Sequence, residues 1–212
     1  LFNNLKLLLT SALLSDILDD LNLTGVLSNR FQLNIPNQKI FGRAKTLRID
    51  LCPDDDDYKK IYDSLHLYDH IVSNDIIVVA NNIPDFAFFG ELNANLAIRS
   101  GAGGAIIDGV TRDTKETTDI GFPVFSKGNY CKDTRKRGIV TSRNKTVIID
   151  GVSIHKDDLI FGDKDGIVVI PKKKEKMIID MALEKMSQEK NILIDVARGV
   201  STNALVEKYG LF

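Results

Sequence analysis

The sequence predicts a mixed α/β fold in which a layer of alternating strands and helices is backed by a second sheet. Two observations carry this prediction. Between residues 75 and 126, apolar strand patterns alternate with helical patterns, as expected for parallel strands joined by helices. Between residues 147 and 170, four short strand patterns follow one another with turns between them. No linker rich in Gly, Ser or Pro interrupts residues 1–212, which are therefore predicted to form one domain.

The first third of the chain predicts a helix, a strand and a second helix. Thr10–Leu21 carries apolar residues at helical spacing, and the hydroxyl group of Thr10 or Ser11 is placed to cap this helix. Ile40–Ile49 alternates like a strand, and Tyr58–Tyr68 is predicted to form a short helix.

The middle of the chain repeats a strand–helix pattern. Asp75–Ala80 is predicted to be a buried strand because its residues after the aspartate are all apolar. A helix over Glu91–Ser100, a strand over Gly104–Asp108, a short helix from Asp113 and a strand over Pro123–Ser126 follow.

The last third predicts short strands and then a long helix. The helix is expected from Lys174 to about Arg198, followed by a short tail, Leu205–Phe212. The strands are expected at Val147–Ile149, Val152–Ile154, Asp158–Gly162 and Gly166–Ile170.

Composition limits the partners of this chain. Hydrophobic residues make up 43% and charged residues 27% of its 212 residues, which is ordinary for a globular protein. The net charge of -1 lacks the basic excess of a nucleic-acid-binding protein, and the basic runs at 132–137 and 172–176 are interpreted as solvated faces or turns. No apolar run approaches the roughly 18 residues of a membrane span. We therefore expect neither direct nucleic-acid binding nor a membrane-spanning segment.

The cysteines and histidines favour a reducing, cytoplasmic location without a zinc site. Cys52 and Cys131 are the only cysteines, so no disulfide framework is expected. His66 and His70 could share a helix face, but a metal site would need a third ligand that the sequence does not offer. They are interpreted as surface or interface residues.

The most informative stretch begins with a glycine at a helix start. Gly90 follows the strand over Asp75–Ala80 and the segment 81–89, and it opens the helix from Glu91. The first N–H groups of a helix have no partner within the helix, and the helix dipole adds partial positive charge there. A small carboxylate or phosphate fits such an end.

An arginine and an aspartate follow the next strand. Arg112 and Asp113 come after the strand over Gly104–Asp108, so they are expected beside the helix start if the two strands are parallel neighbours. Arg112 could then bind the same carboxylate, and Asp113 offers a hard oxygen ligand for Mg²⁺ or Mn²⁺. The alternative interpretation is a surface pair that caps the next helix.

Ordered blocks of sequence identify a family resemblance. The central blocks are Gly90-Glu91-Leu92, the run from Gly103 to Asp113, and Phe122-Pro123-Val124-Phe125. The outer blocks are Ser15-Asp16-Ile17-Leu18, Gly42-Arg43-Ala44-Lys45-Thr46 and the run from Asp158 to Pro171. In this order they resemble the RraA-like family, which contains 4-hydroxy-4-methyl-2-oxoglutarate aldolases (class II, pyruvate-forming) and ribonuclease E activity regulators.

The resemblance implies a three-layer β/β/α swivelling-domain fold and a trimeric or hexameric ring with its site between subunits. It implies that the helix at about 174–198 packs at a subunit interface. Glu189 on this helix is a candidate for an acidic residue that a neighbouring subunit contributes, although a solvated helix glutamate is the simpler interpretation.

The resemblance also implies roles for the central residues. The aldolase signature is an acidic residue, twenty intervening residues and Arg-Asp, which Glu91, Arg112 and Asp113 match except that the family has aspartate where Glu91 stands. The backbone from Gly90 to Asn93, Leu92 included, would hold the substrate carboxylate. Arg112 would bind the oxo acid and steady the enolate, Asp113 would hold the metal, and Glu91 would hold a metal-bound water.

The implied activity is that of a divalent-metal-dependent lyase acting on small 2-oxo acids, through a metal-stabilised pyruvate enolate. Aldol cleavage of 4-hydroxy-4-methyl-2-oxoglutarate and decarboxylation of oxaloacetate share this enolate. The alternative is a non-catalytic protein that regulates ribonuclease E-type RNA processing. Arg112, Asp113 and Glu91 argue against it because a pure binder needs none of them, whereas Glu116, which completes the pattern Arg-Asp-x-x-Glu, is mildly in its favour. A quinone methyltransferase label, used for relatives, has no support because no glycine-rich cofactor loop with a ribose-binding acid is present.

Overall fold

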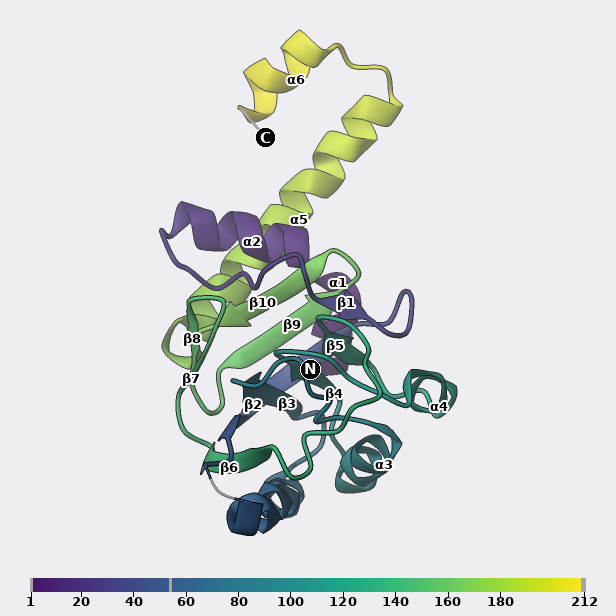
Figure 1. The fold of residues 1–212 in the computed structure, drawn as a ribbon. Helices are drawn as coiled ribbons and strands as arrows, with labels where there is room; N and C mark the ends of the chain where they lie inside the picture. Colours follow the sequence, from purple (N-terminus) through teal and green to yellow (C-terminus); the bar gives the residue numbers. More distant parts are fainter. Residues whose placement is uncertain (1, 54, 211–212) are drawn as a thin grey trace.

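The computed structural model describes residues 2–53 and 55–210, and its centre is a mixed sheet (Figure 1). Within these residues the sheet contains eight strands, seven of them in one path and β6 paired to β2 beside it. The path runs β1 (Gln32–Leu33), β5 (Val124–Ser126), β4 (Gly104–Ile107), β3 (Ile76–Asn81), β2 (Ile40–Leu51), β9 (Leu159–Asp163) and β10 (Gly166–Ile170). The strand β6 covers Gly138–Arg143.

The long strand β2 joins the two halves of the fold. Along one edge, residues 44–49 pair in parallel with β3, which continues in parallel to β4 and β5. Along the other edge, residues 40–43 pair with β9 and residues 47–51 pair with β6, both antiparallel. One strand that changes partners along its length bends the sheet. The last two strands of the predicted second sheet are therefore continuous with the first sheet, whereas the strands at 147–149 and 152–154 pair with each other in a separate two-stranded sheet.

The inside of the bend is closed by a hairpin of β7 (Val147–Ile149) and β8 (Val152–Ile154). Each of these strands buries its first and last residue and exposes the middle one, the period-2 pattern of a half-buried hairpin. Their side chains join a core cluster with β-branched and aromatic residues from β2, β3, β5 and β9. Burial of this cluster holds the two halves of the sheet together.

Helices cover the outer face of the parallel strands. The α-helices α3 (Glu91–Ser100) and α4 (Thr114–Asp119) and the 3₁₀ helix η1 (Asp55–His70) lie on this face (Figure 1). Ala94 and Ala97 of α3 are fully buried, so the helix packs closely on the sheet. The predicted helix at 58–68 is thus present, with a longer and tighter 3₁₀ form.

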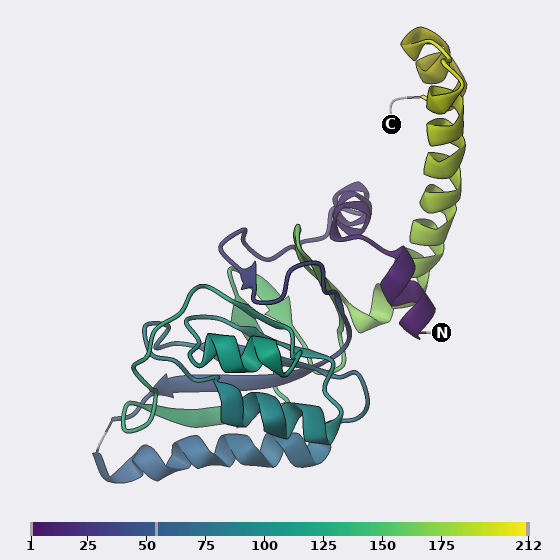
Figure 2. The same cartoon turned by 90° about the vertical axis from the view of Figure 1, so that its right-hand side faces the viewer.

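A helical arm projects from the antiparallel half of the sheet (Figure 2). The helices α1 (Phe2–Leu8) and α2 (Ser11–Asp20) and the base of α5 (Glu175–Ala197) pack beside β9 and β10, where a third core cluster forms. The distal part of α5 extends away from the body, and α6 (Thr202–Tyr209) folds back along it. A 3₁₀ turn, η2 (Lys172–Lys174), precedes α5.

The mixed α/β fold that the sequence predicts, and the three-layer form of it that the family resemblance implies, are confirmed. Thr10 Oγ1 accepts a hydrogen bond from the Leu13 N–H at 3.2 Å, which makes Thr10 the predicted cap. The helices α1 and α6 and the strands β1 and β6 were not predicted.

None of the described helices is both long and apolar enough to cross a membrane. Cys52 and Cys131 form no disulfide.

Candidate functional site

The candidate site lies where the parallel strands β3, β4 and β5 end and three loops leave the sheet. Single backbone bridges join these loops: Phe89 with Thr111, Thr111 with Asn129, and Ala87 with Asp133. The carboxyl edge of parallel strands is the usual ligand-binding edge of α/β proteins. Residues far apart in the sequence are therefore brought together here.

Lys127 fixes the points where two of these loops begin. Its Nζ lies 2.6 Å from Asp108 Oδ1 and 2.7 Å from Asp150 Oδ1. Burial alone would lower the pKa of this lysine, but hydrogen bonds and charge from the two aspartates outweigh burial and raise it. Asp108 directly follows β4 and Lys127 directly follows β5, so this charged cluster holds the two strand ends together.

Gly90 is required at the start of α3 because there is no room for a side chain at this position. Its backbone is extended (φ -157°, ψ -165°), a conformation open to any residue. A Cβ atom on Gly90, however, would lie 2.5 Å from Oδ2 of Asp113 and 3.1 Å from Cγ of Arg112. The missing side chain lets the Arg112-Asp113 pair lie directly against the N-terminus of the helix.

Asp113 is turned toward α3. It precedes α4 in a left-handed conformation (φ 50°, ψ 42°) and makes no side-chain capping bond to α4. Its Oδ2 instead accepts a hydrogen bond from the Glu91 backbone N–H at 3.2 Å. Asp113 thus stands at the N-cap position of α4, as the alternative interpretation expects, but its side chain does not cap that helix. One of the N–H groups predicted to hold a substrate carboxylate already has a carboxylate partner.

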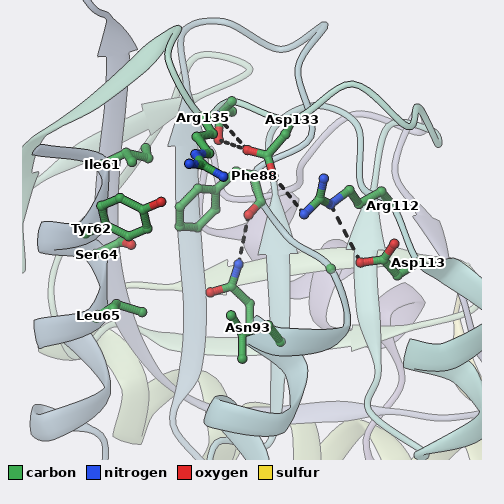
Figure 3. Close-up of a pocket in the computed structure, with 13 residues that line it drawn as sticks. Ile61, Tyr62, Ser64, Leu65, Phe88, Asn93, Arg112, Asp113, Asp133 and Arg135 are labelled. Carbon is green, nitrogen blue, oxygen red and sulfur yellow. Dashed lines mark hydrogen bonds and ion pairs between the residues drawn. The ribbon is translucent and has the colours of Figure 1, made fainter. Parts of the chain in front are cut away.

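Arg112 is held between two carboxylates (Figure 3). Its Nε lies 3.6 Å from Asp113 Oδ2, and its Nη2 lies 2.8 Å from Asp133 Oδ2. Its backbone N–H donates to the Phe89 carbonyl at 3.0 Å, which places it beside the start of α3. The side chains of Arg112, Asp113 and Asp133 remain 39%, 41% and 33% exposed, so a ligand can reach them.

Asn93 is fixed by its neighbours. Its Nδ2 donates to the Phe88 carbonyl at 2.9 Å, and its Oδ1 accepts from the Tyr68 hydroxyl at 2.9 Å. Burial raises the pKa of Tyr68, so its hydroxyl stays protonated and acts as the donor. The side chain of Asn93 therefore ties the first turn of α3 to η1 and to the loop that precedes α3.

These residues surround a pocket of about 160 Å³. One wall is charged or polar and the opposite wall, from η1 and the loop after β3, is largely apolar. The lining residues are Ile61, Tyr62, Ser64, Leu65, Phe88, Gly90, Leu92, Asn93, Arg112, Asp113, Asp133, Thr134 and Arg135. Arg112 and Asp113 also line a second hollow with Asn129, Tyr130 and Cys131. Arg112 and Asp113 thus lie between two hollows and form part of the lining of each.

The acidic residues are less concentrated than a preformed metal centre requires. Among the described residues, no three His, Cys, Asp or Glu side chains are grouped to hold a metal ion. Mg²⁺, however, commonly binds through one or two carboxylates and keeps several waters. The half-exposed carboxylate of Asp113 suits that kind of site. Glu91 is exposed on the first turn of α3 and is not one of the described residues that line the pocket.

Two further predicted acids lie elsewhere in the same chain. Glu116 is exposed in the first turn of α4. Glu189 is exposed on the arm, where it lines a different pocket with Asp16, Lys185 and Tyr209. The structure therefore brings together Gly90, Arg112 and the backbone of Glu91 with Asp113, and it leaves Glu189 apart from them.

Sequence reasoning missed the loop after β5. Asp133, Thr134 and Arg135 line the pocket, but they lie within a basic run interpreted as a solvated turn. One signal was available: Asp133 is the only acidic residue among residues 132–137. A single acid among five other residues, four of them basic, indicates a specific ion-pair partner.

The fold and the site define an α/β protein with a small pocket of mixed charge at the carboxyl edge of its parallel strands. A family model described as RraA-like, Aldolase/RraA, matches residues 11–169. The chain belongs to this RraA-like family.

Two relatives show how far the sequence similarity extends. The chain is 30% identical over 177 residues to "Putative 4-hydroxy-4-methyl-2-oxoglutarate aldolase" of Halalkalibacterium halodurans, covering 83% of this chain and 79% of that protein. It is 27% identical over 200 residues to Protein DlpA of Legionella pneumophila, covering 94% of this chain. The match spans only 32% of the length of Protein DlpA.

Solved structures share the fold. An uncharacterized protein from Pseudomonas syringae superposes with a TM-score of 0.86 at 25% identity, covering 98% of this chain and 93% of that one. Streptomyces coelicolor RraAS2, described as an unusual member of the RNase ES inhibitor RraA protein family, gives a TM-score of 0.76 at 22% identity. That alignment covers 86% of this chain and 90% of RraAS2.

Proposed function

We propose that this protein is a divalent-metal-dependent carbon–carbon lyase that releases pyruvate from small 2-oxo acids. The observation that carries the proposal is the contact of Arg112 and Asp113 with the glycine-opened N-terminus of α3 inside one pocket. The relative named as an aldolase supports the same class of reaction. A 4-hydroxy-4-methyl-2-oxoglutarate-like substrate is the leading candidate, and oxaloacetate is the second.

The helix start and Arg112 bind the substrate anion. The backbone N–H groups of Leu92 and Asn93 at the start of α3 offer donors to the substrate carboxylate, with the helix dipole adding positive charge. Arg112, oriented by Asp133, places its guanidinium where negative charge grows on the 2-oxo oxygen. These contacts strengthen as the substrate approaches the enolate, which is the condition for catalysis.

A bound Mg²⁺ or Mn²⁺ would supply Lewis acidity toward the 2-oxo acid. The residues fit such an ion in its water-rich form, with Asp113 as its protein ligand. Glu91, whose backbone N–H contacts the Asp113 carboxylate, would hold one of the waters of the ion. To take this role, the Asp113 carboxylate shares or gives up its contact with the Glu91 N–H.

Bond cleavage then balances as a retro-aldol reaction. The C3–C4 bond breaks, and its electron pair becomes the enolate of pyruvate facing Arg112. The C4 hydroxyl loses its proton as its oxygen becomes the new carbonyl, and we assign relay of this proton through water to the exposed Glu91. Protonation of the enolate at C3 completes pyruvate. In the decarboxylation of oxaloacetate, C4 leaves as carbon dioxide and the same enolate forms.

Pyruvate release in a coupled assay tests this function. Both substrates are compared in Mg²⁺, in Mn²⁺ and in EDTA, with protein-free metal as background. Metal-dependent release above background is expected and ranks the two substrates. Release no faster than the background in every combination would overturn the lyase proposal and favour a non-catalytic regulator of RNA processing.

We further propose that the chain is a single domain that acts as a homo-oligomer, a trimer or a hexamer, in the cytoplasm. The arm has little of the chain's own body to pack against beyond its base, and it exposes Leu193, Val196 and Val206. A neighbouring subunit would cover this apolar surface. Glu189 is on the arm, so it can approach Arg112 only in another subunit.

Mixing two inactive variants tests the shared site. Arg112→Ala and Glu189→Ala subunits each lose activity alone, but a mixed oligomer contains some interfaces with both native residues. Co-assembly of the two variants is expected to restore a measurable fraction of wild-type pyruvate release, up to about one quarter for random pairing in equal amounts. Mixed oligomers without any recovery, at a verified wild-type size, would contradict a site shared between subunits.

A further inference from the structure

Arg135 is a cation of the pocket that the proposed reaction does not use. Figure 3 shows the guanidinium groups of Arg112 and Arg135 on opposite sides of the Asp133 carboxylate. Arg112 is paired with Asp113 and with Asp133. Across the residues that the structure describes, by contrast, no carboxylate lies within ion-pair distance of the Arg135 guanidinium. Both aspartates of the pocket lining are thus engaged by Arg112, and the Arg135 guanidinium has no direct carboxylate partner among the described residues.

The turn that carries Arg135 is held in place. The Arg135 N–H donates to Asp133 Oδ1 at 2.5 Å, and its carbonyl accepts from Arg137 Nη1 at 3.2 Å. Thr134 between them is buried, and its N–H donates to the Ala87 carbonyl at 3.0 Å. The backbone under Arg135 is thus tied to the loop before α3, so the arginine leaves the pocket rim from a fixed point.

An apolar wall faces the space between the two arginines. Ile61 and Leu65 of η1 line the pocket together with the Phe88 ring, beside which Figure 3 draws the Arg135 side chain. This combination of charges at two points and an apolar surface fits an extended molecule that has an anionic group at each end and a short carbon chain between them.

We propose that Arg135 binds the distal carboxylate of a dicarboxylic 2-oxo acid while Arg112 and the start of α3 bind the 2-oxo carboxylate end. This subsite rests on the proposed function for the position of the first carboxylate, and it assigns to Arg135 the discrimination between 2-oxo acids with and without a second carboxylate beyond the bond that is cleaved. In a 4-hydroxy-4-methyl-2-oxoglutarate-like substrate, the C5 carboxylate departs with the second pyruvate. Its charge does not change during cleavage, so Arg135 contributes binding and little to the chemical step.

Kinetics with two matched substrates test the subsite. The second substrate, 4-hydroxy-4-methyl-2-oxopentanoate, has a methyl group where the first has its distal carboxylate. Arg135→Gln is expected to raise KM for the dicarboxylate about tenfold or more, with kcat changed by less than about threefold, and to leave kcat/KM for the methyl analogue unchanged. Arg135→Lys is expected to recover part of the loss. Lys136→Gln, a neighbouring exposed cation outside the pocket lining, is the matched control.

A binding measurement tests the subsite without turnover. Titration calorimetry in excess Mg²⁺ compares 2-oxoglutarate with 2-oxopentanoate, neither of which has the hydroxyl group needed for aldol cleavage. The wild-type protein is expected to bind 2-oxoglutarate at least about tenfold more tightly, and Arg135→Gln to remove that preference.

The two experiments separate the two proposals. Preference for 2-oxoglutarate that depends on Arg135 supports the subsite even if no pyruvate is released, in which case only the lyase proposal fails. Turnover of both aldol substrates with equal losses, or no losses, in Arg135→Gln would overturn the subsite and leave the lyase proposal standing. Failure of both 2-oxo acids to bind, or equal affinity for them in the wild-type protein, would also overturn it.

Discussion

Asp113→Asn is expected to lower metal-dependent pyruvate release about 10³-fold or more, to the level of the free metal. The substitution removes the carboxylate that the proposed function assigns to the divalent ion, while the amide oxygen can still accept the hydrogen bond from the Glu91 N–H. Asparagine also tolerates the left-handed conformation of this residue, so the fold should be unaffected. Turnover in Mg²⁺, with thermal unfolding measured in parallel, checks this prediction.

Two comparisons make the Asp113→Asn result specific. Asp119→Asn changes another exposed aspartate at the far end of α4, which pairs with Lys115 on the helix surface, and should retain wild-type activity. Binding of Mn²⁺, followed by electron paramagnetic resonance, should weaken in Asp113→Asn and remain normal in Asp119→Asn. Normal Mn²⁺ binding and normal turnover in Asp113→Asn would remove Asp113 from the metal site.

Gly90→Ala is expected to reduce kcat/KM about 10²-fold while leaving the protein folded. The added Cβ would meet the Asp113 carboxylate at 2.5 Å and Arg112 at 3.1 Å, so both side chains must move from the start of α3. A displacement of about 1 Å in positioning groups can cost this much in rate. The backbone of Gly90 is extended, so alanine introduces no strain in its dihedral angles.

Gly166→Ala is the matched control for this substitution. A Cβ at Gly166 meets nothing within 4 Å. The free energy of unfolding should therefore change by no more than about 0.5 kcal/mol, and kcat/KM by no more than about twofold. Steady-state kinetics and urea unfolding of both variants check the prediction. Wild-type kcat/KM in Gly90→Ala would show that the reacting groups do not depend on the close approach of Arg112 and Asp113 to α3.

Local patterns were sufficient to predict much of the fold. The apolar run after Asp75 and the alternation after Ile40 identified the two central strands, because burial on one or both faces leaves a direct period in the sequence. The same patterns could not show that the sheet bends. The bend arises because β2 has different antiparallel partners along its two halves, one of which, β6, comes from residues 138–143 with only partial burial.

The candidate site was predictable as far as its strand ends. Gly90 and Asp113 stand at the starts of recognisable helices, and Arg112 lies in the short loop after a recognisable strand, so parallel pairing places them together. Asp133 and Arg135 reach the same pocket through a loop whose position depends on backbone bridges to Ala87 and to Thr111. Bridges of this kind leave no period in the sequence. Without them, a mixed-charge run is read as a solvated turn.

The helical arm shows a different limit of prediction from sequence. The helical period predicted a helix from Lys174 to about Arg198, and the structure has α5 at Glu175–Ala197. A helical period does not show, however, whether the partner surface belongs to the same chain. In the structure, Ile178 and Ala182 near the base are buried, while Leu193 and Val196 near the far end are exposed. The same helical period therefore places apolar residues in the core of the chain near the base of α5 and on its exposed surface near the far end.

The most direct test of the central claim is the rate of pyruvate release from 4-hydroxy-4-methyl-2-oxoglutarate by the wild-type protein in Mg²⁺, relative to the same protein in EDTA and to protein-free Mg²⁺. The account predicts release well above the protein-free rate in Mg²⁺ and loss of that excess in EDTA. Equal rates with and without the protein would contradict it for this substrate, and an excess that persists unchanged in EDTA would contradict the metal-dependent mechanism.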